Sequence, residues 1–219
     1  QIFLFFNGFH NVYWDYFMMI FSDRFVWVPF YASFIFVLLK NFPVKVVMST
    51  IVVITLIILF SDQTASGILK PLVARMRPSN PDNPISPMVH VVQGYRGGRY
   101  GFPSSHAANA WSMAFFAQYL VRRSKLTIFL CLWALITSYS RMYLGVHYFG
   151  DLLIGTLIGF LYATLYYYIF QYFLRKHTER FKPNHDIRFA SVPIITGLVS
   201  IWVIICTSGI LSFYSIPLR

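Results

Sequence analysis

The chain has 219 residues, of which 57% are hydrophobic, 20% are aromatic and only 11% are charged. A soluble domain carries about 25% charged residues, and the apolar residues here form long runs without amphipathic spacing, so we exclude a soluble globular protein. The net charge is +11, but the basic residues gather in short loops between apolar runs, which is typical of membrane topology and not of nucleic-acid binding. We predict an all-α, polytopic membrane helical bundle formed by one domain over residues 1–219.

The first segment, Gln1–Ser22, is rich in aromatic residues and differs from the rest of the chain. Asn7, Asn11 and Asp15 recur every four residues, so a helix here would carry a polar stripe. This pattern predicts an interfacial helix that lies on the membrane surface. An additional membrane span is the alternative.

Six apolar segments follow, and each is predicted to cross the membrane as a helix. They are Phe25–Leu39, Val46–Ala65, Ala107–Val121, Leu126–Tyr139, Leu152–Leu174 and Ser191–Tyr214. Cys131 and Cys206 lie inside these segments, which indicates neither a disulfide framework nor a cysteine metal site.

Lysine and arginine residues set the expected orientation. The loops after the first, third and fifth spans hold ten of the 18 basic residues, and the positive-inside rule places these loops in the cytoplasm. They are Lys40–Lys45, Arg122–Lys125 and Arg175–Arg188. The N-terminal segment, residues 66–106, residues 140–151 and the tail Ser215–Arg219 then face outward.

Residues 66–106 form the longest interruption and are dense in proline and glycine, which predicts an ordered irregular loop. The outward connections carry cations with few acids nearby, a composition that favours an anionic ligand. These cations are Lys70, Arg75, Arg77, Arg96, Arg99 and Arg141. Lys70 and Arg77 are seven residues apart and would share one face of a helix, although they also fit snorkelling residues at the end of a membrane helix.

Two further patterns concern histidines. Ser104 or Ser105 is placed to cap the helix that follows, whose free N–H groups would bind an anion beside His106. An ordinary cap with a surface histidine is the alternative reading. His147 and Asp151 are four residues apart, so the carboxylate can hold one imidazole nitrogen and aim the other.

The alternative for His147 is a surface histidine satisfied by its neighbour. Two histidines and one aspartate could also hold zinc, but the surrounding cations would repel a metal. A phosphate site without metal fits better, because fixed cations can stabilise the charge themselves.

Three segments resemble the motifs of the type 2 phosphatidic acid phosphatase (PAP2) superfamily of integral membrane lipid phosphatases, in their order and spacing. They are KPLVARMRP at Lys70–Pro78, PSSH at Pro103–His106 and SRMYLGVHYFGD at Ser140–Asp151. One position departs from the family pattern, because Ser105 stands where the family has glycine. A serine keeps the backbone N–H but adds a hydroxyl close to the expected phosphate.

The resemblance implies a role for each matching residue and implies neither a metal nor another cofactor. His147 corresponds to the nucleophile that forms a phosphohistidine, and Asp151 to the residue that orients it. His106 corresponds to the general acid that protonates the leaving oxygen and then activates water. The implied phosphate-binding residues are Lys70, Arg77, Ser104, Ser105 and Arg141.

The implied function is hydrolysis of a lipid phosphate or diphosphate at the outer face of a bacterial inner membrane, with the lipid and the bilayer as partners and no nucleic acid. Candidate substrates are undecaprenyl diphosphate, phosphatidylglycerol phosphate, phosphatidic acid and lipid A 1-phosphate. A lipid-to-lipid phosphotransferase that uses the same site is the alternative. A non-catalytic lipid-binding protein is a second alternative, and such a protein would be expected to have lost some of the catalytic residues. Arg96 and Arg99 are candidate headgroup contacts or simple bilayer contacts, and the oligomeric state stays open.

Overall fold

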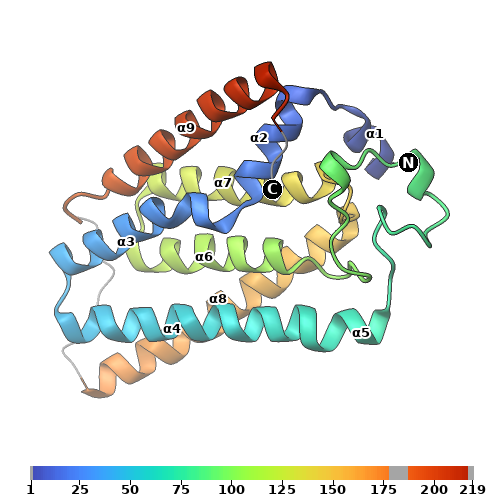
Figure 1. The fold of residues 1–219 in the computed structure, drawn as a ribbon. Coiled ribbons are helices and arrows are strands. Elements are labelled where there is room, and N and C mark those ends of the chain that lie inside the picture. The colour runs from blue at the N-terminus through green and yellow to red at the C-terminus, as the bar shows by residue number, and fades with distance from the viewer. Residues whose placement is uncertain (1, 178–186, 217–219) are drawn as a thin grey trace.

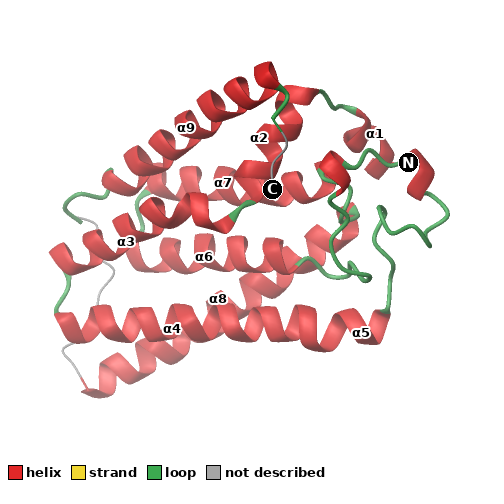
Figure 2. Ribbon diagram, in the orientation of Figure 1, coloured by secondary structure: helices red, strands yellow, loops and turns green. Residues whose placement is uncertain are grey.

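The computed structural model describes residues 2–177 and 187–216, and these form an all-helical bundle (Figure 1; Figure 2). Within these two ranges there is no β-strand, and only an isolated antiparallel bridge joins Met76 to Tyr100. The main helices are α1 (Ile2–Gly8), α2 (Val12–Ser22), α3 (Val28–Asn41), α4 (Val44–Asp62), α5 (Lys70–Val73), α6 (Ser105–Val121), α7 (Ser124–Tyr143), α8 (Phe149–His177) and α9 (Val192–Tyr214). The shorter elements are η1 (Arg24–Trp27), the π-helix η2 (Gln63–Leu69), η3 (Ser86–Met88) and η4 (Val92–Gly94).

The predicted all-α membrane class is confirmed. In the described part of the chain, four helices are long and apolar enough to cross a membrane: Val44–Val73, Ser124–Tyr143, Phe149–Leu174 and Val192–Tyr214. A fifth span results if α2 and Arg24–Asn41 count as one, although the chain bends by 64° between them. The helix α6 has 17 residues, fewer than the ~20 that usually span a bilayer. The structure therefore has a helix at each of the six predicted positions but four to five candidate spans.

The helix α6 lies in the middle of the bundle and packs against α4, α7 and α8 (Figure 1). Its most extensive contact is with α8, where Gly155 and Gly159 are four residues apart. A Cβ atom on Gly155 would lie 2.5 Å from the carbonyl oxygen of Ser104, and one on Gly159 would lie 2.5 Å from that of Ala108. Small residues at this spacing let two helix backbones approach closely. The start of α6 is therefore held against the first turns of α8.

The N-terminal segment consists of two helices, so the prediction of one continuous helix over Gln1–Ser22 is wrong. The side chain of Asn11 caps α2 by accepting a hydrogen bond at 2.9 Å from a backbone N–H in its first turn. Asn7 donates to the carbonyl oxygen of Tyr143 at 2.8 Å, and Asp15 accepts from the Tyr143 hydroxyl at 2.7 Å. The predicted polar stripe thus attaches α1 and α2 to α7.

Residues 66–106 and 140–151, both predicted to face outward, lie at one end of the bundle (Figure 1). The short connections between α3 and α4 and between α6 and α7 lie at the opposite end. This separation agrees with the two-sided arrangement expected from the positive-inside rule. Most of the predicted basic loop Arg175–Arg188 and the end of the tail Ser215–Arg219 lie outside the described residues.

The close contact of α6 and α8 predicts that Gly159→Ala destabilises the protein by about 1–3 kcal/mol, because the added methyl meets backbone atoms of α6. Gly209→Ala on α9 is the matched control, since a Cβ there meets nothing within 4 Å. Thermal unfolding of both variants in detergent micelles measures the effect. Equal unfolding temperatures for the two variants would show that the α6–α8 spacing is not tight.

Candidate active site

Four helix ends meet at the end of the bundle that carries the outward connections (Figure 1). Lys70 begins α5, Ser104 caps α6, and Arg141 lies in the last turn of α7. His147 lies in the turn between α7 and α8, and Asp151 lies in the first turn of α8. The fold therefore brings together residues that the chain separates by up to 81 positions.

His147 and Asp151 form a buried hydrogen-bonded pair. Their exposed fractions are 1% and 0%, and Nδ1 of His147 lies 3.3 Å from Oδ2 of Asp151. The same carboxylate oxygen accepts a hydrogen bond from the backbone N–H of Tyr148 at 2.8 Å. A carboxylate in the first turn of a helix is also stabilised by the helix dipole. The Asp151 carboxylate is thus held in place by contacts other than the one with the imidazole.

Arg77 approaches the other nitrogen of the same imidazole. Its Nη1 lies 3.1 Å from Nε2 of His147 and donates to the carbonyl oxygen of Val146 at 3.1 Å. A guanidinium has no acceptor, so Nε2 must accept and carry the lone pair. Nδ1 then carries the hydrogen that Asp151 accepts. In this tautomer Nε2 is unprotonated, and its lone pair accepts from Arg77.

Arg77 reaches His147 from a loop, so the prediction that Lys70 and Arg77 share one helix face is wrong. The helix α5 ends at Ala74, whose φ of 49° is left-handed. The chain then becomes extended, and the backbone N–H of Arg77 donates to the carbonyl oxygen of Arg99 at 3.2 Å. Gly97 has φ of 67°, and a Cβ there would lie 3.1 Å from Cζ of Arg77, so this position favours glycine.

The two serines at the start of α6 have different partners. The Ser104 side chain caps α6 by accepting from the Ala107 N–H at 3.3 Å, and its backbone N–H donates to the carbonyl oxygen of Asp151 at 3.0 Å. The Ser105 hydroxyl accepts from Nζ of Lys70 at 3.3 Å. The serine that replaces the family glycine therefore helps to hold Lys70, which also donates to Ser66 at 2.9 Å.

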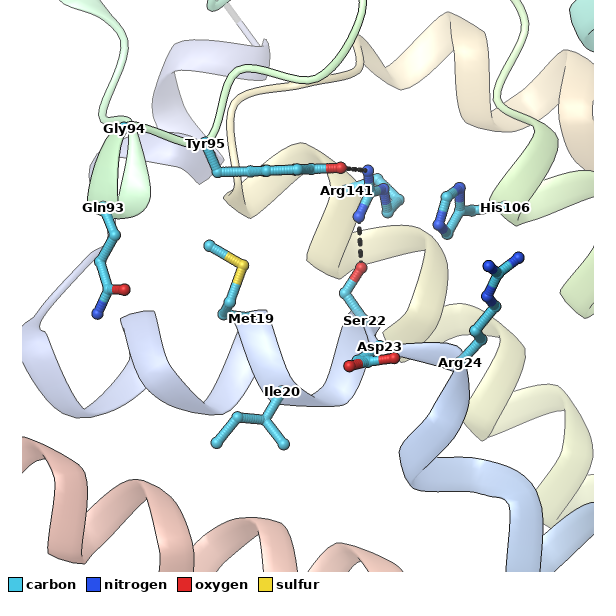
Figure 3. Close-up of a pocket in the computed structure, with 10 residues that line it drawn as sticks. All are labelled: Met19, Ile20, Ser22, Asp23, Arg24, Gln93, Gly94, Tyr95, His106 and Arg141. Carbon is cyan, nitrogen blue, oxygen red and sulfur yellow. Dashed lines mark hydrogen bonds between the residues drawn. The ribbon is translucent and has the colours of Figure 1, made fainter. Parts of the chain in front are cut away.

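Arg141 is 3% exposed and is held from two distant segments (Figure 3). One terminal nitrogen donates to the hydroxyl of Ser22 at the end of α2, and the other donates to the hydroxyl of Tyr95 at 2.9 Å. In the part of the chain that the structure describes, no carboxylate pairs with Lys70, Arg77 or Arg141. The Nε atoms of Arg77 and Arg141 are buried without a hydrogen-bond partner. These unsatisfied cations favour an anion.

The histidine of the second motif faces a cavity of about 610 Å³ beside this cluster (Figure 3). His106 is exposed to the cavity and lines it together with Arg141. Further lining residues come from the end of α2, from the start of η1 and from residues 93–95. A molecule in this cavity would contact His106 directly.

The cluster keeps both histidines neutral. Burial and the adjacent cations Arg77 and Arg141 lower the pKa of His147 well below 6.5. The pKa of His106 is also lowered, first by the protein atoms that replace water around the ring and then by Arg141, Lys70 and Arg77. Burial lowers the pKa of Arg77 to about 10, and Arg141 adds to this shift, so Arg77 stays charged at neutral pH. The site is therefore a cationic pocket around a neutral imidazole pair.

Arg96 and Arg99, the two predicted headgroup contacts, lie outside this cluster. Arg96 donates to the carbonyl oxygen of Ser79 and, at 3.2 Å, to the hydroxyl of Ser86, so its guanidinium helps to hold the loop. Arg99 lies 5.7 Å from the ring of Tyr100. Neither arginine lines the cavity.

The sequence patterns missed several residues of the site, namely Ser22, Arg24 and Tyr95 at the cavity. Arg75, predicted only as one of the outward cations, forms an ion pair with Asp151. Arg24 lies on the predicted outer side, so its departure from the positive-inside rule was a signal that could have identified it. Ser22 and Tyr95 carry no such signal, because their contacts with Arg141 span 119 and 46 residues.

No group of three or more metal-binding side chains occurs within the described ranges.

Comparison with known proteins gives consistent matches. The family model of the PAP2 superfamily matches residues 46–175. A lipid A 4'-phosphatase of Bacteroides thetaiotaomicron is 45% identical over 208 residues, which cover 92% of this chain and 91% of that protein. A lipid A 4'-phosphatase of Porphyromonas gingivalis is 34% identical over 78% of this chain and 72% of its own length. No solved structure matches the chain significantly.

The lowered pKa of His147 predicts that its ring is still neutral at a pH at which an ordinary imidazole, with a pKa of about 6.5, is protonated. As the pH falls through about 6.5, this histidine binds a proton in the unfolded chain but not in the folded chain. The contribution of the neutral His147 ring to the free energy of unfolding is therefore present above about pH 6.5 and is lost as the pH falls below it. Nitrogen-15 NMR of histidine-labelled protein in micelles measures the protonation.

Arg77→Gln is the comparison variant for this measurement. It removes a cation 3.1 Å from Nε2, so the protonation midpoint of His147 should rise. A His147 ring that titrates near pH 6.5 in the unmodified protein would contradict the assignment.

Proposed function

This chain belongs to the PAP2 superfamily and is a multi-pass membrane lipid phosphatase, and from that premise we propose that it removes the 4'-phosphate of lipid A through a phosphohistidine on His147. The substrate rests on two relatives named as lipid A 4'-phosphatases. The candidates considered from sequence alone included the 1-phosphate of lipid A and not the 4'-phosphate. The observation that supports the mechanism is the unprotonated Nε2 of His147, which lies 3.1 Å from Nη1 of Arg77.

In the first step, Nε2 of His147 attacks phosphorus and the bond to the sugar oxygen breaks. His106 donates a proton to that oxygen, which leaves as the alcohol of the dephosphorylated lipid. The phosphorylated imidazole is cationic when Nδ1 keeps its hydrogen, and the carboxylate of Asp151, 3.3 Å away, stabilises that charge. In the second step, His106 accepts a proton from water as the water oxygen attacks phosphorus. The bond between phosphorus and Nε2 of His147 breaks, its electron pair returns to Nε2, and inorganic phosphate leaves.

Charge stabilisation in this scheme comes from the protein. Phosphoryl transfer spreads negative charge over the equatorial oxygens, and Lys70, Arg77 and Arg141 are the cations that would face them. His106 must be protonated to act as an acid, although the empty site disfavours its protonated form. A bound phosphate dianion offsets the cations and raises the pKa of His106. Substrate binding thus creates the general acid.

We place the site at the outer face of a bacterial inner membrane, with six spanning helices and a cytoplasmic location for the basic loops. The support is the distribution of lysine and arginine, together with the position of the cluster at the end of the bundle that carries the outward connections. A lipid substrate would reach such a site from the outer leaflet with its acyl chains still in the bilayer.

The first test uses purified protein in micelles with lipid A and EDTA. We expect release of inorganic phosphate, and mass spectrometry should place the loss at the 4' position. His147→Ala should lower the rate by about four orders of magnitude or more, because the nucleophile is lost. His10→Ala, an exposed histidine outside the cluster, is the control and should stay active. Full activity of His147→Ala, or loss of the 1-phosphate instead, would refute this assignment.

The second test traps the intermediate with lipid A that carries radioactive phosphate. Rapid denaturation in base during turnover should leave label on His147 of the unmodified protein as an acid-labile, base-stable phosphohistidine. His106→Ala removes a group that acts in both steps, so it should lower turnover by roughly 10²–10⁴-fold. The label should be absent in His147→Ala. Transfer of label to an added acceptor lipid, in place of free phosphate, would show a phosphotransferase.

A further inference from the structure

The cavity beside His106 has one wall from the N-terminal segment of the chain. Met19, Ile20, Ser22, Asp23 and Arg24 line it opposite the loop residues 93–95 (Figure 3). We call residues 19–24 the N-terminal wall. The match to the PAP2 superfamily begins at residue 46, so this wall lies outside the matched region. The family motifs therefore do not account for what the wall contributes.

Arg24 is the cation of the N-terminal wall, and a defined turn holds its backbone. The carboxylate of Asp23 accepts a hydrogen bond from the N–H of Phe25 at 2.9 Å and so caps the turn η1. The guanidinium carbon of Arg24 lies 5.1 Å from the centre of the Phe25 ring. In the view of Figure 3, the His106 ring lies between the side chains of Arg141 and Arg24.

Arg24 also lies where two cavities adjoin. Ser22, Arg24 and His106 line both the 610 Å³ cavity and a second cavity of about 240 Å³. The second cavity continues between the helices past Trp27, Tyr31 and Trp133 and is mainly apolar. A phosphate group at His106 would therefore have Arg24 beside it, whichever cavity receives the remainder of the lipid.

The charge of Arg24 is available to a ligand. Among the residues that the structure describes, no ion pair joins Arg24 to a carboxylate, and its side chain is exposed. Its charge acts on His106, because Arg24 is one of the cations that lower the pKa of that histidine. An unpaired cation that acts on the proposed acid from the cavity side is placed to contact an oxyanion there.

We propose that Arg24 binds a non-bridging oxygen of the substrate phosphate on the His106 side, and that the N-terminal wall thereby completes the phosphate site. The ligand class is a phosphate monoester, and the inference rests on the proposed function only in taking that monoester to belong to a lipid. Arg141 and Arg24, which line the same cavity as His106, would then both bind the phosphate. The hydrogen bond between Arg141 and Ser22 attaches the N-terminal wall to Arg141.

The test measures binding of inorganic phosphate by the full chain in detergent micelles, from the rise of the thermal unfolding midpoint with phosphate concentration. Arg24→Gln should weaken binding by about tenfold or more, since a charge-assisted hydrogen bond is lost. Arg24→Lys keeps the charge and should stay within about threefold of the unmodified protein. Lys40→Gln is the matched control: it removes an exposed cation 5.7 Å from a Phe36 ring at the other end of the bundle and should change nothing.

The same variants are then assayed with lipid A, where Arg24→Gln should raise KM by about the same factor. Unchanged phosphate binding in Arg24→Gln overturns the proposal, even if KM for lipid A rises, because Arg24 would then contact another part of the lipid. Absence of phosphate binding by the unmodified protein overturns it as well. Weakened phosphate binding in Arg24→Gln without hydrolysis of lipid A would support the phosphate contact and refute the proposed substrate.

Discussion

The position of Asp151 fixes most of the site. Its carboxylate accepts from His147 and from the backbone of Tyr148, and its backbone carbonyl oxygen accepts from the N–H of Ser104. These contacts join the start of α8 to the start of α6. One turn later Gly155 allows the backbone of α8 to approach Ser104. The distance between the two helices and the aim of the imidazole are therefore set by the same few atoms.

The second constraint is electrostatic. Burying Arg77 and Arg141, and half-burying Lys70, without acids costs free energy, because each charge loses water and gains no counter-ion. The protein offsets part of this cost with neutral partners: Ser66 and Ser105 for Lys70, the carbonyl oxygen of Val146 for Arg77, and two hydroxyls for Arg141. The remaining charge suits a phosphate, and together with burial it lowers the pKa of His147 and so keeps the ring neutral. The same cations that lower the stability of the fold also favour the binding of an anion.

The N-terminal segment is attached to the bundle and lines the cavity beside His106. Asn7 and Asp15 attach it to α7, and Ser22 attaches its end to Arg141. It thus forms one side of the cavity while the motif residues form the other. The relative from Bacteroides thetaiotaomicron matches 92% of this chain, well beyond the part that the family model covers.

The sequence by itself determined the class of the protein and predicted most of the residues that the fold gathers in the candidate site. Long apolar runs require helices in a membrane, and the four-residue spacing of His147 and Asp151 brings them together through local geometry alone. The sequence did not determine the break at Asn11, the loop path that carries Arg77 to His147, or the contacts of Arg141 with Ser22 and Tyr95. These depend on which helix ends pack together, and hydrophobic periodicity does not encode contacts between residues 46 to 119 positions apart. Only the tertiary structure could place Arg24 beside His106, because that neighbourhood exists only after α2, α6 and α7 have packed.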